Sequence, residues 1–247
     1  MLVGTADVDT LARSQATATI THFRRDAVTL TGVTCLQLTA EMRNSAREAV
    51  LPPSLHPTIP PALSIQVWSV AESPWGPFRW AHARITCRSG VRARGYTSAA
   101  YASTNDACEG LRTAFGFPAR VAQVDLRHSY DGADANVTVA GQAVLSIAAI
   151  DPEPLDRNDV QYTGTLNLAT TPNGLRLVQV EADHEASRVE RLAARLLAFE
   201  PVAWGNALLV PAFVVSASLA QETVVFPPLR FVCRPGELAF TGTESID

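Results

Sequence analysis

The sequence contains no lysine, because all twenty of its cationic side chains are arginines. An arginine side chain keeps its proton at physiological pH, since its pKa lies above about 12. The absence of lysine therefore excludes any chemistry in which a neutral side-chain amine attacks a carbonyl group. The chain is also rich in alanine, and a high-GC coding bias would replace lysine by arginine without a functional reason.

Cysteine is scarce as well. The four cysteines, Cys35, Cys87, Cys108 and Cys233, are far apart and form no CxxC pair. The five histidines show neither HxH nor HExxH spacing, and no serine or cysteine nucleophile motif accompanies them. We therefore expect buried thiols, and we expect no metal site, disulfide framework, hydrolase triad or cofactor.

Excess charge and targeting signals are also missing. The net charge is −4 and no basic stripe occurs, so the sequence gives no indication of nucleic-acid binding. The N-terminus lacks the basic start and apolar run of a secretory signal, from which we expect a cytoplasmic location. The uncharged segment 201–220 is interrupted by Asn206 and Pro211, so we expect a buried strand with flanking turns and no membrane partner.

What the sequence does contain is a series of strand patterns. At 247 residues and 47% hydrophobic composition, the chain can bury a large core, and we expect one domain over 1–247. Alternating or β-branched runs predict strands at 27–40, 62–73, 78–87, 119–128, 135–150 and 163–170. The dipeptides Asp131-Gly132 and Asn173-Gly174 between such patterns predict antiparallel hairpins.

Helical patterns are fewer. Residues 103–116 combine Ser103 as a possible N-cap, apolar residues at helical spacing and Gly116 as a stop. Residues 184–199 place five apolar side chains on one helical face, and 46–53 predicts a short helix that prolines end. The predicted fold class is thus α+β, predominantly antiparallel β with two or three helices.

The order of these parts resembles the acetoacetate decarboxylase superfamily. "AREAVLPPSLHP" resembles the family's helix and proline turn, and "SPWGPFRWA" resembles its glycine-aromatic loop. "YASTNDACEGLRTAFGFPAR" (101–120) matches, without a gap, the family's tyrosine, capped helix, arginine and aromatic-Pro-Lys-Lys. The segments "LNLATTPNGLRLVQVEA" and "LLVPAFVVSASLAQETVVFP" resemble its late hairpin and closing strand. The resemblance implies a cone-shaped antiparallel β-barrel around a mostly apolar pocket, and a homo-oligomer.

The catalytic residues of the family are not present at the matching positions. In the family, the first lysine forms a Schiff base with a β-keto acid and the second is a neighbouring cation. These positions are occupied by Ala119 and Arg120. The family's glutamate position falls on Trp80, the carboxylate one strand earlier falls on Gln66, and its early arginine has no clean counterpart near 37–43. The covalent and acid–base parts are lost together, which indicates a reused pocket.

Several residues are candidates for that pocket. Trp80 could line it together with Trp68, Trp75, Phe78 and Phe117, making a cavity for a large unsaturated ligand, although the same residues fit an ordinary aromatic core.

Three polar residues are candidates for catalysis. Arg120 could stabilise an enolate or a carboxylate, or it could point outward to a surface carboxylate. Tyr101 could donate to a carbonyl oxygen or simply to water. His82 shares a strand face with Trp80.

Two classes of function fit these observations. One is an enzyme of bacterial specialised metabolism that catalyses cyclisation, dehydration or a related lyase step on a polyketide-like or keto-acid substrate without an imine. A pericyclase is a variant of this hypothesis. The other is a non-catalytic protein that binds an apolar acid or a polyene. Imine-free decarboxylation is a third hypothesis, although the sequence offers no evident electron sink for it.

Overall fold

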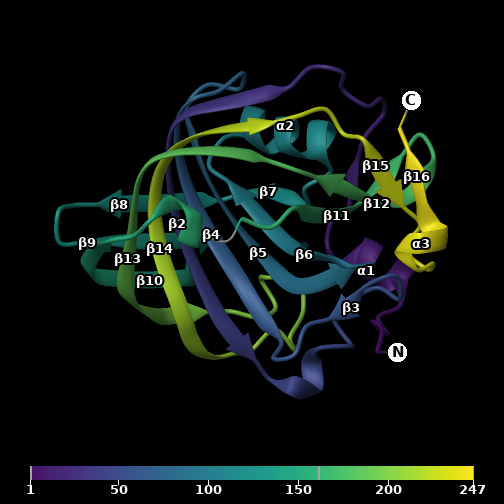
Figure 1. Ribbon diagram of the computed structural model, residues 1–247, viewed down its shortest axis with the longest axis horizontal. Coiled ribbons are helices and arrows are strands. Elements are labelled where there is room, and N and C mark those ends of the chain that lie inside the picture. The colour runs from purple at the N-terminus through teal and green to yellow at the C-terminus, as the bar shows by residue number, and fades with distance from the viewer. Residues whose placement is uncertain (1, 161, 247) are drawn as a thin grey trace.

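The structure, a computed structural model, describes residues 2–160 and 162–246 (Figure 1). The strands are β1 (Ala18–Thr19), β2 (Val28–Met42), β3 (His56–Pro57), β4 (Ala62–Glu72), β5 (Phe78–Ser89), β6 (Arg92–Ala102), β7 (Ala119–Val121), β8 (Gln123–His128), β9 (Gly132–Val139), β10 (Gln142–Pro154), β11 (Thr165–Thr171), β12 (Gly174–Val180), β13 (Asp183–Phe199), β14 (Pro211–Phe226), β15 (Phe231–Cys233) and β16 (Thr243–Ser245). The helices are α1 (Val8–Ser14), α2 (Asn105–Phe115) and α3 (Ala239–Gly242), with 3₁₀ turns at Asn44–Ala46 and Arg157–Asp159.

The strands form one sheet whose hydrogen-bonded path runs β16-β15-β12-β11-β6-β5-β4-β2-β14-β13-β10-β9-β8. Most neighbouring strands are antiparallel, and β11 pairs in parallel with β1 and β6, as β7 does with β6. The predicted antiparallel, curved sheet is thereby confirmed. In the described residues no pairing joins the two ends of this path, so the sheet curls without closing into the expected barrel.

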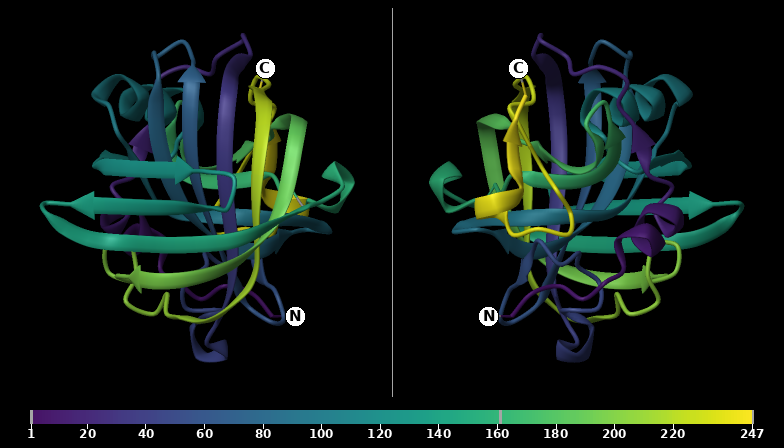
Figure 2. Two further views of the ribbon diagram at one scale, coloured as in Figure 1. Left: turned by 90° about the vertical axis from the view of Figure 1, so that its left-hand side faces the viewer. Right: turned by 90° about the vertical axis from the view of Figure 1, so that its right-hand side faces the viewer.

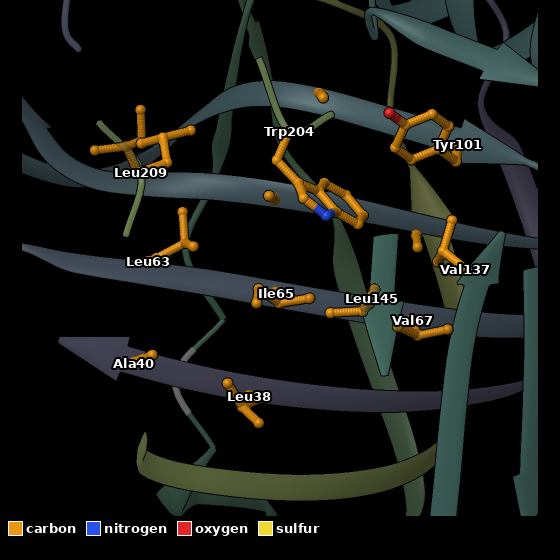
Figure 3. Packing of buried hydrophobic residues seen from close by; sticks show 14 of the residues in the cluster. Leu38, Ala40, Leu63, Ile65, Val67, Tyr101, Val137, Leu145, Trp204 and Leu209 are labelled. Carbon is orange, nitrogen blue, oxygen red and sulfur yellow. The ribbon is translucent and has the colours of Figure 1, made fainter. Parts of the chain in front are cut away.

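The central strands β2, β4 and β5 separate two hydrophobic cores. Figure 3 shows the first core, where Leu38, Ile65 and Val67 pack toward Leu145 and the indole ring of Trp204. The strands β8 to β10 cross the long strands on this side and cover it (Figure 2). The second core lies on the opposite face and contains most of the buried aromatic residues, with α2 packed against it (Figure 1).

The helix α2 follows its predicted signals closely. It begins after Thr104, whose hydroxyl accepts a hydrogen bond from the Ala107 N–H at 3.2 Å, so Thr104 and not Ser103 is the N-cap. It ends at Gly116, where φ is +72°. Glycine adopts this left-handed conformation without the steric cost that a Cβ atom adds.

Two other helix predictions are wrong. Residues 184–199 lie in β13, which pairs with β10 on one side and β14 on the other. A strand between two long partners satisfies its backbone groups in both ladders, and this tertiary pairing overrides a helical spacing of apolar residues. The 46–53 region contains the end of a 3₁₀ helix followed mainly by turns, and its prolines prevent a longer helix.

The segment 201–220 divides into two parts. Its first half forms turns, and its second half belongs to β14, as predicted, although Phe213 and Val215 in that strand are more than half exposed. The helix α1 was not expected from the sequence, and Asp7 caps it by accepting a hydrogen bond from the Thr10 N–H at 2.8 Å. No helix in the described residues has the length and apolar character required to cross a membrane.

Candidate functional site

The register of β4, β5, β6 and β7 determines which side chains share a face of the sheet. Trp80 of β5 lies opposite Trp68 of β4, and His82 lies opposite Gln66. Through β6, the same face continues to Ala119 of β7. The position that matches the family's Schiff-base lysine therefore lies on the same face as the predicted aromatic residues, within the second core.

Tyr101 and Arg120 lie on the other face. Tyr101 of β6 lies opposite Arg120 of β7, one residue after the pair formed by Ala100 and Ala119. Successive side chains of a strand point to opposite faces, so a residue next to Ala119 cannot share its direction.

Each of these two side chains has a structural partner on that face. The Tyr101 hydroxyl donates to the Ala203 carbonyl oxygen at 2.5 Å, beside Trp204 (Figure 3). Burial raises the pKa of Tyr101, and the neighbouring Arg120 partly offsets this effect. Arg120 is half-buried and donates to the Ser14 carbonyl oxygen at 3.1 Å, at the end of α1. The prediction that these two side chains enter the pocket is wrong.

On the face that carries Trp80, the structure contains a cavity of about 70 Å³. Its lining residues come from β4, β5, β11, β12, β13 and β14 and from the loops beside them: Gln66, Trp68, Trp80, His82, Arg84, Phe117, Tyr162, Thr163, Gly164, Thr165, Val180, Glu181, Ala182, His184 and Phe226. Of the predicted site residues, Gln66, Trp68, Trp80, His82 and Phe117 line it. Ala119 is buried on the same face but does not line the cavity.

The aromatic side of the cavity is closely packed. The Trp80 ring lies 5.2 Å from that of Trp68, 4.9 Å from that of Phe117 and 4.3 Å from the His82 imidazole, measured between ring centroids. Trp75 and Phe78 were expected here but do not line the cavity.

The position of Trp75 has a specific cause. Its indole lies against Gly110 of α2, so close that a Cβ atom at this glycine would come within 2.1 Å of the ring. Trp75 therefore packs on the helix and away from the cavity.

Arg84 is the arginine that lines the cavity, and the sequence analysis missed it. Glu181, the carboxylate that also lines it, pairs with Arg94. Its side chain is 4% exposed, and its Nη1 donates to the Thr163 carbonyl oxygen and to the Thr165 hydroxyl, both at 3.0 Å. Within residues 2–160 and 162–246 it forms no ion pair with a carboxylate. Burial lowers the pKa of Arg84 to about 10, which leaves the guanidinium charged at neutral pH. A buried charge without a counter-ion is costly, so its presence beside a cavity indicates an anion site.

His82 lies next to Arg84 on the same face. Burial, with a smaller contribution from the Arg84 charge, lowers the pKa of His82 well below 6.5. The imidazole is therefore neutral at pH 7, and it can donate a hydrogen bond through one nitrogen and accept one through the other.

Several buried polar atoms of the lining residues lack a hydrogen-bond partner in the described part of the chain. They are Trp68 Nε1, Trp80 Nε1, His82 Nδ1 and Arg84 Nε. Buried polar groups are nearly always paired in folded proteins, and each unpaired group costs about 1–3 kcal/mol. Three of these four groups can only donate, and the described residues supply no acceptor for them.

A second polar group lines another part of the cavity. The Tyr162 hydroxyl donates to Oε2 of Glu222 at 2.9 Å, and Nδ1 of His184 lies 3.0 Å from the same oxygen. The rings of Tyr162 and His184 stack, with centroids 3.7 Å apart and planes at 11°. The sequence analysis missed this cluster because it assigned His184 to a helix.

A wider cleft of about 510 Å³ meets the cavity at Arg84 and Thr163. Hydroxyl-bearing residues of the central strands contribute much of its lining: Thr39, Ser64, Thr86, Ser216 and Ser218. Arg84 thus borders both the cavity and the cleft. Gln37, which lines the cleft, accepts a hydrogen bond from Gln66, which lines the cavity.

Comparison with solved structures identifies the fold. The acetoacetate decarboxylase of Legionella pneumophila superposes with a TM-score of 0.73 at 15% sequence identity, over 84% of this chain and 87% of that one. The enduracididine biosynthesis enzyme MppR, complexed with pyruvate, gives 0.67 at 15% identity, over 83% and 88%. An acetoacetate decarboxylase-like enzyme from Sphingomonas wittichii gives 0.66 at 14% identity, over 93% and 99%.

Sequence comparisons alone do not identify the chain, because no protein-family model and no curated protein matches it. The structural likeness confirms the acetoacetate decarboxylase-like fold that the order of motifs predicted. At these identities the likeness establishes the fold and leaves the chemistry to the residues of the site.

Proposed function

We propose that this chain, which has the acetoacetate decarboxylase-like fold with alanine at the Schiff-base position, is an enzyme that acts on a small keto acid without a covalent imine. The reaction is a lyase, dehydration or cyclisation step that passes through an enolate. The observation that carries the proposal is the buried guanidinium of Arg84, which lines the cavity and forms no ion pair with a carboxylate of the described residues.

In this proposal Arg84 binds the carboxylate of the substrate. Its Nη1 already donates to Thr163 and Thr165, which hold the guanidinium in place, while Nε has no partner among the described residues. Hydrogen bonds between a guanidinium and a carboxylate are charge-assisted and roughly twice as strong as neutral ones. Binding of the acid would also neutralise the buried charge.

The neutral donors act on the keto group. No described residue accepts a hydrogen bond from the indole N–H of Trp68 or Trp80, and His82 is neutral and lies against Trp80. Donors fixed around a developing oxyanion in a water-poor site stabilise the transition state, and loss of one such donor typically lowers turnover by ~10²–10³-fold. Electrostatic stabilisation of this kind replaces the iminium that a lysine would supply.

The size of the cavity favours a keto acid over a polyketide-like substrate or a polyene. Its volume of about 70 Å³ is well below the ~300–1,000 Å³ of pockets that hold drug-sized ligands. A large unsaturated ligand would need more space than this cavity offers. MppR, which has the same fold, was solved with pyruvate, a keto acid of suitable size.

The alternative is a protein that binds such an acid without converting it. The same guanidinium and donors would then serve affinity alone. Imine-free decarboxylation is a third possibility, in which the donors around the keto oxygen would act as the electron sink.

Titration calorimetry with pyruvate, 2-oxobutanoate and acetoacetate, followed by NMR analysis of the products, tests the proposal. We expect binding that weakens at least tenfold in Arg84→Gln. Arg88→Gln is the matched control, because Arg88 is an exposed arginine of the same strand. Binding without turnover of any compound would favour the binding protein. Equal affinity in the two variants would show that Arg84 does not bind the acid.

A further inference from the structure

The cluster of Tyr162, His184 and Glu222 brings together three segments that are distant in the sequence. Tyr162 precedes β11, His184 lies near the start of β13, and Glu222 lies in β14. Tyr162 and His184 line the cavity that Arg84 lines, and Glu222 holds both of them through Oε2. The cluster is therefore part of the site, although the proposed function assigns it no role.

The contacts of Glu222 indicate which ring nitrogen of His184 carries the proton. The Glu222 side chain has no exposed surface, and its Oε2 accepts from the Tyr162 hydroxyl. Burial and the Glu222 charge raise the pKa of Tyr162, so that its hydroxyl keeps the proton that it donates. For Nδ1 of His184 to donate to the same oxygen, that nitrogen must carry the proton. In the neutral imidazole, Nε2 then has the free lone pair.

Among the residues that the structure describes, none forms a hydrogen bond with Nε2 of His184. The imidazole is stacked on Tyr162 on one side and lies 6.2 Å from the Trp68 ring, measured between centroids. Its orientation is thus held by a carboxylate and two aromatic rings, while one basic nitrogen is left without a protein partner. A buried carboxylate that fixes the tautomer of a histidine is the arrangement that general bases use.

We propose that His184, oriented by Glu222, is the catalytic base that takes the α-proton of the keto acid, and that Tyr162 is a positioning residue. This inference rests on the proposed function, because the acid must be bound in the cavity by Arg84. Nε2 takes the proton, the C–H electron pair forms the C=C bond of the enolate, and the carbonyl π pair moves to the oxygen. Glu222 stabilises the imidazolium, which then returns the proton to carbon or gives it to the leaving group.

The test follows exchange of the α-protons of pyruvate and 2-oxobutanoate in D₂O by proton NMR, beside calorimetric measurement of Kd. We expect the wild-type chain to accelerate exchange. His184→Gln should lower the rate by ~10²–10⁴-fold with Kd changed by less than about threefold, as expected for loss of a general base. His22→Gln, which changes an exposed histidine, is the matched control and should exchange at the wild-type rate.

Two further measurements distinguish a catalytic cluster from a purely structural one: the exchange rate of Tyr162→Phe and the tautomer of His184. Tyr162→Phe should lower exchange by a smaller factor than His184→Gln, again with little change in Kd. In the ¹⁵N-labelled chain without ligand, His184 should show the proton on Nδ1, and Glu222→Gln should shift this tautomer toward Nε2–H.

Three results would overturn the inference: a wild-type chain that binds the acids without exchange, exchange that His184→Gln leaves unchanged, or a proton on Nε2 of His184. A binding site that does not depend on Arg84 would instead overturn the proposed function, and calorimetry reports that outcome separately from the exchange rate.

Discussion

Ala119 and Arg120 are neighbours in β7, yet they face opposite sides of the sheet. Ala119 is buried on the side of Trp80 and His82, while Arg120 lies beside Tyr101 and donates to the Ser14 carbonyl oxygen. Strand alternation alone separates the two positions that match the family's lysine pair. The arginine that lines the cavity is Arg84, which belongs to β5.

Arg120→Ala should therefore leave the cavity intact. The variant loses one hydrogen bond to the end of α1, which we expect to lower the free energy of unfolding by about 1 kcal/mol. The affinity for pyruvate should stay within twofold of the wild-type value. Thermal melting checks the change in stability, and calorimetry checks the affinity. A large loss of affinity would show that Arg120 contributes to the binding site.

Borohydride treatment in the presence of acetoacetate or pyruvate should trap no adduct on a side chain. The chain has no lysine, and an arginine does not form an imine because it keeps its proton. Intact-mass spectrometry followed by peptide mapping measures this directly. A reduced adduct mapped to a residue of the cavity would contradict the imine-free chemistry.

Arg84→Met should separate binding from stability. The substitution removes a buried charge for which the described residues supply no counter-ion. The free energy of unfolding should therefore stay the same or rise by up to about 2 kcal/mol, while affinity for keto acids is lost. Urea denaturation and calorimetry on the same sample provide both values. Strong destabilisation would show that the guanidinium is chiefly a structural donor to Thr163 and Thr165.

Acidification should destabilise the protein partly through His82. Its pKa in the folded chain lies well below 6.5, because of burial first and the Arg84 charge second. Below pH 6.5 the unfolded chain binds a proton at this position that the folded chain does not. The free energy of unfolding therefore falls as pH falls, by about 1.4 kcal/mol per pH unit for this one group, until the folded pKa is reached.

Comparison of the wild-type chain with His82→Gln by urea denaturation at pH 7, 6 and 5 isolates that contribution. The variant should lose less stability between pH 7 and pH 5. His22→Gln, an exposed histidine, should behave like the wild type. Identical pH profiles of wild type and His82→Gln would contradict the lowered pKa.

Much of the fold could be predicted from local patterns. The hairpins β8–β9 and β11–β12 have their turns beside the predicted glycine dipeptides, and the helix α2 ends at the predicted Gly116. The error at β13 has a physical cause, since its apolar residues fit both a helix and a strand, and the pairing with β10 and β14 is a tertiary property.

The site was only partly accessible from the sequence. Alternation correctly grouped Trp80 with His82, and its extension by one further step would have included Arg84. The contact between His184 and Glu222 joins residues 38 positions apart through the register of two long strands. No local pattern contains that register, so this half of the site required the structure.

A crystal structure of the chain with bound pyruvate tests the proposed keto-acid site most directly. We expect the carboxylate oxygens at about 2.7–2.9 Å from guanidinium nitrogens of Arg84. The keto oxygen should lie at hydrogen-bond distance from an indole N–H of Trp68 or Trp80 or from His82, and the methyl carbon next to the keto group should face His184. An acid bound outside the cavity, or bound within it with its carboxylate away from Arg84, would contradict the proposal.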